Sequence, residues 1–142
     1  MDFKRLHQIA DQARAESRRR EQEKQQQEAD QQAAAANARW KAKWKEAEDA
    51  LAGLPNAMEA AARGGRTEIG VFGVREEYFS FKEPFWSWKK RFQPTSIPDF
   101  MRFLEKECKR RGLKVSYSVD VEVNRHGRPN PGTAFLRLLV RW

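Results

Sequence analysis

The first 52 residues contain no proline and no glycine, and alanine, glutamine, glutamate, lysine and arginine dominate them. All five are strong helix formers, so the sequence predicts one long helix from residue 2 to about residue 52. At 1.5 Å per residue such a helix would be about 75 Å long. Its middle, residues 14–28, has no apolar stripe. A helix that is polar all round stands in solvent, supported by ion pairs between residues three and four apart.

Two short apolar stripes mark the ends of this predicted helix, each at the spacing of one helix face. The second stripe favours docking of the helix base on a core. The first is too short for a core and is typical of a contact with a second copy or another protein; without one, the start of the helix would fluctuate between helix and coil. The stripes are Phe3, Leu6, Ile9 or Ala10, and Ala13 at the start, and Trp40, Trp44, Ala47, Leu51 and Leu54 at the end.

The partner-contact residues predicted from these stripes come from both ends of the helix. Trp40 and Trp44 either dock on the domain or extend an interface with a second copy. The predicted contact set is Phe3, Leu6, Ile9, Trp40 and Trp44.

The charge of the chain is distributed unevenly. Residues 1–38 hold seven lysines and arginines against seven aspartates and glutamates, so the net charge of +8 lies in residues 39–142. We therefore divide the chain into a solvent-exposed charged helical arm, residues 1–38, and a compact basic αβ domain, residues 39–142. The arm is either partly disordered or in a coiled coil. If the protein binds a polyanion, the compact domain should do so.

Alternation in the last thirty residues predicts a β-hairpin. Apolar residues occupy every second position of KVSYSVDVEV (114–123) and TAFLRLLVRW (133–142), around the loop NRHGRPNPGT. One register satisfies both patterns. It places Tyr117, Val119 and Val121 opposite Val140, Leu138 and Leu136, and it places Asp120 and Ser116 opposite Arg137 and Arg141.

The remaining signals complete an α+β fold with an α/β-like crossover. Gly53 and Pro55 end the long helix, and a short helix follows at 57–63. Then comes β-α-β-β: a strand at 67–74, a helix capped by Ser96 or Thr95, and the hairpin. We expect a small three-stranded mixed sheet covered on one face by helices. Its first two strands form a right-handed parallel crossover if they are neighbours, and a short extra strand is expected within 77–82.

The stretch FKEPFWSWKKRF (81–92) has two interpretations. A small core needs large side chains, so Phe79, Phe81, Phe85 and one tryptophan are expected to lie in the core or to cover a sheet edge. Alternatively, Trp86 and Trp88 share one side of an extended segment and form a stacking platform for bases. Such a platform would be flanked by the cations Lys89, Lys90 and Arg91.

Two other groups of cations are candidates for phosphate contacts, although each has a structural explanation. The first completes a helix C-terminus, where cations suit the helix dipole. The second lies in a loop whose prolines and glycines also serve turn formation. The predicted nucleic-acid-binding residues are Trp86, Trp88, Lys89, Lys90, Arg91, Lys109, Arg110, Arg111, Arg125, His126 and Arg128. The outer face of the hairpin is a weak candidate, because Asp120 and Glu122 would repel phosphate.

Little in the sequence indicates enzyme chemistry. His7 and His126 are the two histidines, and no cluster of cysteine and histidine has metal-ligand spacing, so we expect no metal and no cofactor. Cys108, the single cysteine, lies on an apolar helix face and is typical of a small core residue. We find no signal-peptide pattern and no apolar run of the roughly 20 residues that span a bilayer, so a cytoplasmic location is expected.

Two functional hypotheses follow. The first is a non-enzymatic binding protein whose basic αβ domain contacts nucleic acid, RNA or single strands, with low sequence specificity. The second is a protein–protein adaptor or self-assembling subunit that acts through its long N-terminal helix. Phosphate contacts weaken steeply with salt and an apolar helix interface does not, which distinguishes the two.

Overall fold

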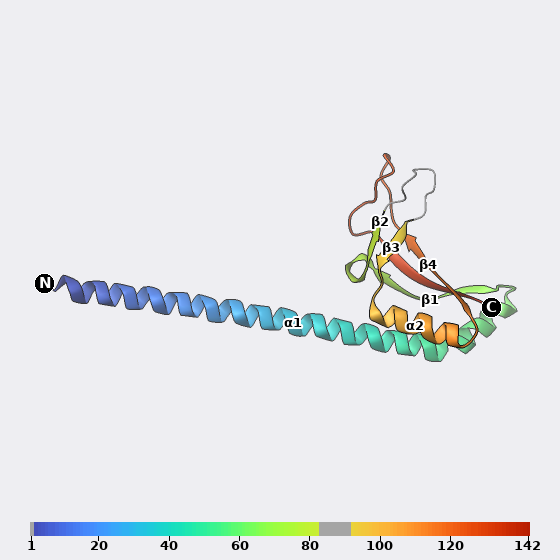
Figure 1. Ribbon diagram of the computed structural model, residues 1–142, viewed down its shortest axis with the longest axis horizontal. Coiled ribbons are helices and arrows are strands. Elements are labelled where there is room, and N and C mark those ends of the chain that lie inside the picture. Colours follow the sequence, from blue (N-terminus) through green and yellow to red (C-terminus); the bar gives the residue numbers. More distant parts are fainter. Residues whose placement is uncertain (1, 83–91) are drawn as a thin grey trace. The chain divides into compact units, whose positions relative to one another are not determined.

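The computed structural model describes residues 2–82 and 92–142. The chain divides into two units, Met1–Ala42 and Lys43–Trp142. Among the described residues, all side chains from residue 2 to residue 42 are exposed, and the hydrophobic core lies within the second unit. The element order, shown in Figure 1, confirms the α+β class and the long N-terminal helix.

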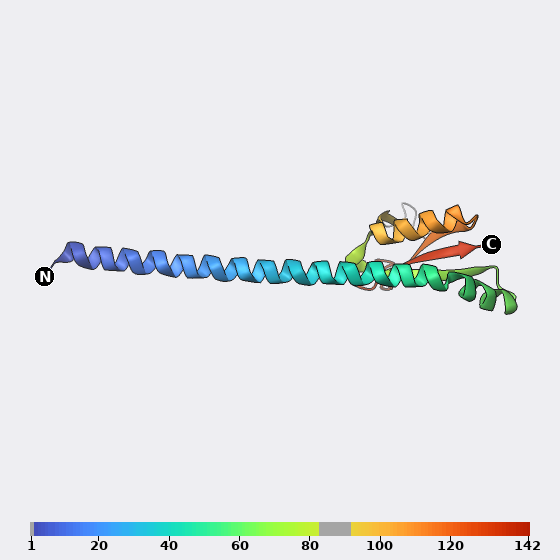
Figure 2. The same ribbon diagram turned by 90° about the horizontal axis from the view of Figure 1, so that it is seen from below.

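Helix α1 spans Phe3–Arg63 and includes Pro55. The short helix expected at 57–63 is therefore the last part of α1, and Gly53 and Pro55 do not end it. The reason is packing: Leu54 is buried and Met58 is half-buried against the same cluster, so apolar burial on both sides of Pro55 outweighs its lost hydrogen bond. The C-terminal turns of α1 change direction (Figure 2), as expected of a helix that contains a proline.

A three-stranded antiparallel sheet forms the centre of the second unit. Its strands are β1 (Glu68–Arg75), β4 (Lys114–Asp120) and β5 (Phe135–Arg141), in the order β1-β5-β4. The sheet is thus antiparallel throughout rather than mixed, because β5 lies between the two strands that the parallel crossover would have paired. The central position buries the inward residues of β5, which are Leu136, Leu138 and Val140.

The register of the hairpin differs by two residues from the expected one. Val115, Tyr117 and Val119 pair with Val140, Leu138 and Leu136. A shift of two leaves every side chain on its expected face, so the alternation alone could not distinguish the two registers. The shift arises because β4 ends at Asp120, and the next residues hydrogen-bond within the connecting loop.

A second, two-stranded sheet lies beside β4. It pairs β2 (Ser80–Lys82) with β3 (Gln93–Ser96), and an isolated bridge joins Phe92 to Val119 of β4. The extra strand expected within 77–82 is therefore present as β2. It follows the short 3-10 helix η1 (Glu76–Tyr78).

Helix α2 spans Asp99–Arg110 and packs its apolar side on the sheet. Its N-cap is Pro98, with no side-chain cap hydrogen bond. Ser96 is not the cap that the sequence suggested, because its hydroxyl accepts a hydrogen bond of 2.9 Å from the Ser80 amide and closes the β2–β3 pair. Gly112 ends the helix region with a φ of +82°, as expected of a glycine after a helix.

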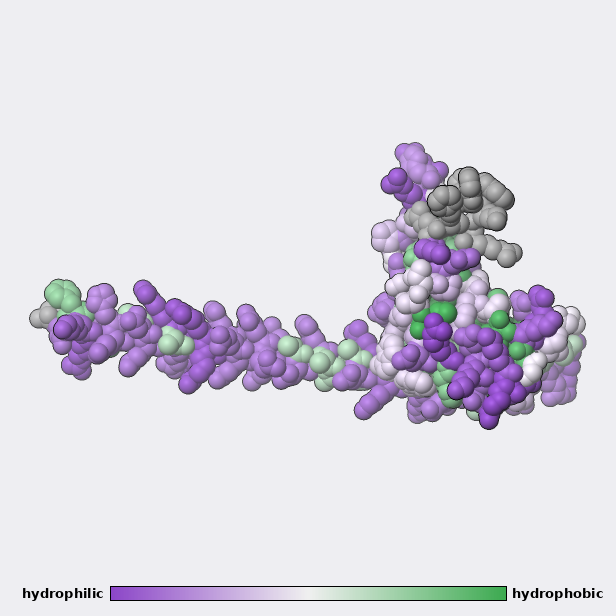
Figure 3. Space-filling model, in the orientation of Figure 1, coloured by the Kyte–Doolittle hydropathy of each residue, from purple (hydrophilic) through white to green (hydrophobic). Residues whose placement is uncertain are grey.

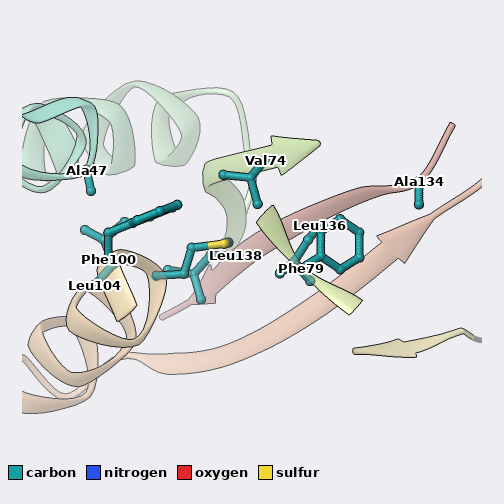
Figure 4. Close-up of a cluster of buried hydrophobic side chains, with 9 residues drawn as sticks. Ala47, Val74, Phe79, Phe100, Leu104, Ala134, Leu136 and Leu138 are labelled. Atoms are coloured by element: carbon teal, nitrogen blue, oxygen red, sulfur yellow. The ribbon is translucent and has the colours of Figure 1, made fainter. Parts of the chain in front are cut away.

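The core lies between the sheet and the helices (Figure 4), and Phe100 is fully buried in it. Its ring contacts those of Trp44, Phe72 and Tyr78 edge to face, with centroids 5.9–6.4 Å apart. Phe79 is buried and Phe81 packs on the cluster, which confirms both as core. Phe85, Trp86 and Trp88, which carry the rest of the aromatic prediction, lie outside the described residues.

The outer face of the sheet contains one close approach of backbone and ring. A Cβ atom at Gly73 would lie 2.5 Å from Cζ of Phe135 on β5, so a side chain at this position would displace the ring. The same ring lies 5.7 Å from the guanidinium of Arg137. Glycine at residue 73 therefore lets an aromatic side chain lie flat across the neighbouring strand.

Candidate nucleic-acid interface

The connection between β4 and β5, residues 121–134, is an ordered extension of the hairpin. The Asn124 amide donates to the Arg128 carbonyl at 2.8 Å, and the Asn130 amide donates to the Glu122 carbonyl at 2.7 Å. Val123 and Pro129 form a bridge between these bonds. The loop thus holds its own shape through backbone pairing.

A tight turn forms the tip of this extension. The Gly127 amide donates to the Asn124 carbonyl at 2.9 Å, and Gly127 has a φ of +77°. The Asn124 side-chain oxygen accepts from the amides of His126 and Arg128, at 2.9 and 3.0 Å. A turn followed by a left-handed glycine is a common way to close a hairpin. It holds Arg125, His126 and Arg128 at the exposed tip.

A second turn fixes the base of the loop. Pro131 and Gly132, with a φ of +77°, occupy the two central positions of a turn between Asn130 and Thr133. This order is typical of a type II turn. The Thr133 hydroxyl donates to the Asn130 carbonyl at 2.8 Å and accepts from the Glu122 amide at 3.1 Å. In Figure 3 the end of the loop is covered with hydrophilic residues.

The cations at the end of α2 are engaged locally. Lys109 pairs with Glu105 at 2.8 Å, and Arg110 pairs with Glu107 at 2.6 Å. Arg111 is the C-cap residue, and its amide bonds to helix carbonyls. This arrangement matches the structural explanation of the group, a helix end completed by cations.

The structure does not bring these cations together with the loop tip. Residues 109–111 precede the first residue of β4, and the loop follows its last residue. A seven-residue strand spans roughly 20 Å, so the two groups lie at opposite ends of β4 (Figure 1). They do not form one continuous patch.

Five predicted site residues, Trp86, Trp88, Lys89, Lys90 and Arg91, lie outside the described residues. The described residues that flank them are placed: Lys82 pairs with Gln93, and Phe92 bridges to Val119. Val119 is the penultimate residue of β4, and only Asp120 separates it from the loop. The chain therefore enters and leaves the 83–91 segment at the end of the sheet that carries the loop.

The open face of the sheet has its charges in pairs. Arg137 lies 3.6 Å from Asp120, and Arg141 lies 3.1 Å from Glu68. The first pair is diagonal, because Asp120 is directly opposite Phe135. A face whose arginines pair with carboxylates attracts phosphate weakly. This agrees with the sequence-based expectation that the outer face of the hairpin is a weak candidate for nucleic-acid binding.

Three titratable groups lie at the contact between α2 and β4. Burial raises the pKa of Glu105, but hydrogen bonds from Lys109 and Tyr117 outweigh it, and the resulting pKa is below the ordinary value. Burial, and then the bond to Glu105, raise the pKa of Tyr117. Burial also raises the pKa of the fully buried Cys108 thiol, so this side chain behaves as a small core residue.

The predicted partner contacts separate into two groups. Phe3, Leu6 and Ile9 are 68%, 50% and 53% exposed, and Trp40 is 39% exposed. Trp44 instead packs against Phe103, with ring centroids 5.6 Å apart, so this residue belongs to the core of the second unit. Trp44 was expected either to dock on the domain or to extend an interface with a second copy, and in the structure it docks on the domain.

Sequence reasoning missed one residue that shapes the candidate site. Asn124 organises the tip through its side chain, and the signal for this was present: asparagine begins turns, and the glycine three residues later accepts a positive φ. Among residues 2–82 and 92–142, no group of three or more His, Cys, Asp or Glu is placed to hold a metal ion.

Comparisons with protein-family models, with curated proteins and with solved structures found no match. Within the described part of the chain, no helix combines the length and the apolar character required to cross a bilayer.

Proposed function

We propose that this is a non-enzymatic binding protein whose basic domain contacts nucleic acid, RNA or single strands, with low sequence specificity. The observation that carries the proposal is the tip of the β4–β5 loop. Its hydrogen bonds hold Arg125, His126 and Arg128 exposed. Among residues 2–82 and 92–142, no carboxylate pairs with Arg125 or Arg128, whereas Lys109 and Arg110 each pair with a glutamate.

Exposed arginines on a loop suit phosphate contacts, since each contact releases condensed counterions. The run Lys89, Lys90 and Arg91 ends next to Phe92, which bridges to the strand that leads into the loop. In this proposal both groups of cations act at one end of the sheet, and Trp86 or Trp88 stacks on bases. Stacking tolerates any base, which accounts for the low specificity.

The test compares two double variants that remove the same charge. Arg125→Ala/Arg128→Ala acts at the loop tip, and Lys109→Ala/Arg110→Ala acts at the opposite end of β4. Fluorescence anisotropy measures the affinity of each variant for labelled single-stranded RNA and for duplex DNA. The titrations are made at about 50 and 200 mM salt. We expect the affinity of the loop-tip variant to fall ten-fold or more. For the single strand, the plot of log K against log salt concentration should become less steep by about 1.4, because two phosphate contacts are lost. The control should stay within about three-fold.

Equal losses in the two variants would mean that net charge alone drives binding. No binding at the lower salt would overturn the proposal altogether. Trp86→Ala/Trp88→Ala then tests stacking, expected to contribute about 1–3 kcal/mol per base.

A second candidate function is supported by the N-terminal half of α1. Phe3, Leu6 and Ile9 are half exposed or more on a segment with no buried residue, which suits a contact with another protein or a second copy. Removal of residues 1–37 should leave nucleic-acid binding intact under the first proposal and should abolish assembly under this one.

A further inference from the structure

β1 is an edge strand of the three-stranded sheet. It pairs with β5 along one side, and no described residue forms a strand along the other. The strand has eight residues, long enough to offer several unpaired backbone groups to another strand. Those groups make the free edge of β1 a site for main-chain pairing.

The side chains of β1 follow a pattern that is the same in both directions. A bulge between Gly70 and Phe72 turns two consecutive residues inward, because Val71 and Phe72 both pack on the core. Ile69 and Val74 also face the core. The two glycines and the terminal charges face outward. From Glu68 to Arg75 the order is out, in, out, in, in, out, in, out, for the sequence EIGVFGVR.

A second copy of β1, laid antiparallel along this edge, matches the strand at every position. The two-fold axis passes between Val71 and Phe72. Directly opposite residues in an antiparallel pair lie on the same face. The pairs are Glu68 with Arg75, Ile69 with Val74, Gly70 with Gly73, and Val71 with Phe72, and each occurs twice. Opposite charges meet, apolar residues meet on the inner face, and glycines meet on the outer face.

The charges are available for this pairing. Arg75 is exposed, and in the described part of the chain it forms no ion pair with a carboxylate. Glu68 pairs with Arg141 at 3.1 Å, and its side chain remains 41% exposed. A carboxylate has several acceptor positions, so Glu68 can accept from a second guanidinium.

We propose that the free edge of β1 is a self-association surface, and that its occupant is β1 of a second copy. Two sheets then join into one continuous antiparallel sheet. The bulge interrupts the ladder at its centre, so pairing comes from the three residues on either side and the dimer is reversible.

Sedimentation velocity of the full chain, over a concentration range of about 1 to 200 µM, measures the dimer dissociation constant. Arg75→Glu places two glutamates opposite each other, twice per dimer, and should raise the constant about ten-fold or more. Glu68→Arg should do the same. The double variant Glu68→Arg/Arg75→Glu restores opposite charges and should return close to the wild-type constant. Arg66→Glu, an exposed position just before β1, is the matched control and should change little.

A disulfide test identifies the contact directly. Residues 68 and 75 are separated by roughly 23 Å along one strand, far beyond disulfide reach, so any bridge in Glu68→Cys/Arg75→Cys joins two copies. Oxidation should give a covalent dimer, and Arg66→Cys should not. A chain that is monomeric throughout the range would overturn the proposal. A dimer that ignores both charge variants and forms no bridge would also overturn it, since the copies would then meet elsewhere.

Discussion

Tyr117 on β4 donates a hydrogen bond of 2.8 Å to a carboxylate oxygen of Glu105 on α2. Glu105 also accepts a bond of 2.8 Å from Lys109, and the Tyr117 hydroxyl lies 3.4 Å from the Met101 carbonyl. This network is a polar link between the second helix and the sheet at the margin of an apolar core.

Tyr117→Phe should destabilise the fold by about 1.5–3 kcal/mol, the range for a hydrogen bond to a charged group. The ring remains in place, so packing changes little. Urea denaturation measures the change, with Ser116→Ala, on the exposed outer face, as the control. A loss no larger than that of the control would contradict the importance of the bond.

The same bond should make stability fall at alkaline pH. Because the pKa of Tyr117 is raised in the folded state, its contribution is fully present below about pH 10 and is lost as pH rises through the folded pKa. Wild-type stability should therefore decline above about pH 10, and Tyr117→Phe should decline less. Parallel profiles for the two proteins would show that other groups set the alkaline limit.

Glu105 sets the opposite dependence in acid. Its pKa is lowered in the folded state, so its contribution is present above the ordinary value of 4.5 and disappears as pH falls through the lower folded pKa. Glu105→Gln should flatten the loss of stability below pH 4.5, as measured by urea denaturation at stepped pH. Glu107→Gln removes a similar helix ion pair without the bond to Tyr117 and should leave the profile nearly unchanged.

The two glycines of β1 should respond differently to alanine. A methyl at Gly73 collides with the Phe135 ring, whereas a methyl at Gly70 lies 3.7 Å from Leu139, an ordinary contact. We expect Gly73→Ala to cost about 1–3 kcal/mol and Gly70→Ala to be near neutral or stabilising. Thermal unfolding of the two variants is the measurement. Adding Phe135→Ala to Gly73→Ala should remove most of the collision, and a difference that persists would have another cause.

Hydrogen exchange should divide α1 near residue 42. Amides of residues 6–40 lie on a helix segment without buried side chains, so they should exchange quickly, while those of α2 should be protected. Strong protection of the amides of residues 6–40 at low protein concentration would contradict this expectation, because it would mean that another part of the protein covers this segment. Repeating the measurement at high concentration tests whether a second copy covers it.

The sequence predicted those features that depend on side-chain period. The face of α1 with Ala47 and Leu54 and the inward residues of β4 and β5 follow from residue spacing alone. Pairing was less predictable. A register shift of two keeps the same faces, and the position of β5 between β1 and β4 depends on which strand gains most from burial on both sides.

The candidate site was predictable as a set of residues and not as a geometry. Arg125, His126 and Arg128 were visible as cations in a loop, but the hydrogen bonds of Asn124 decide that they share one tip. The α2 cations looked equivalent to them in the sequence. Their partners Glu105 and Glu107 lie four and three residues away on the helix, a spacing that would have revealed the ion pairs.

The strand order β1-β5-β4 has a consequence for how the protein is made. Both outer strands hydrogen-bond to β5, which follows them in the chain, so neither has its partner when it leaves the ribosome. Until β5 is synthesised, the nascent chain carries two unpaired strands and the helices whose apolar faces they will cover. The three-stranded sheet can therefore form only after β5 has been synthesised, and β1 and β4 keep unpaired edges until then.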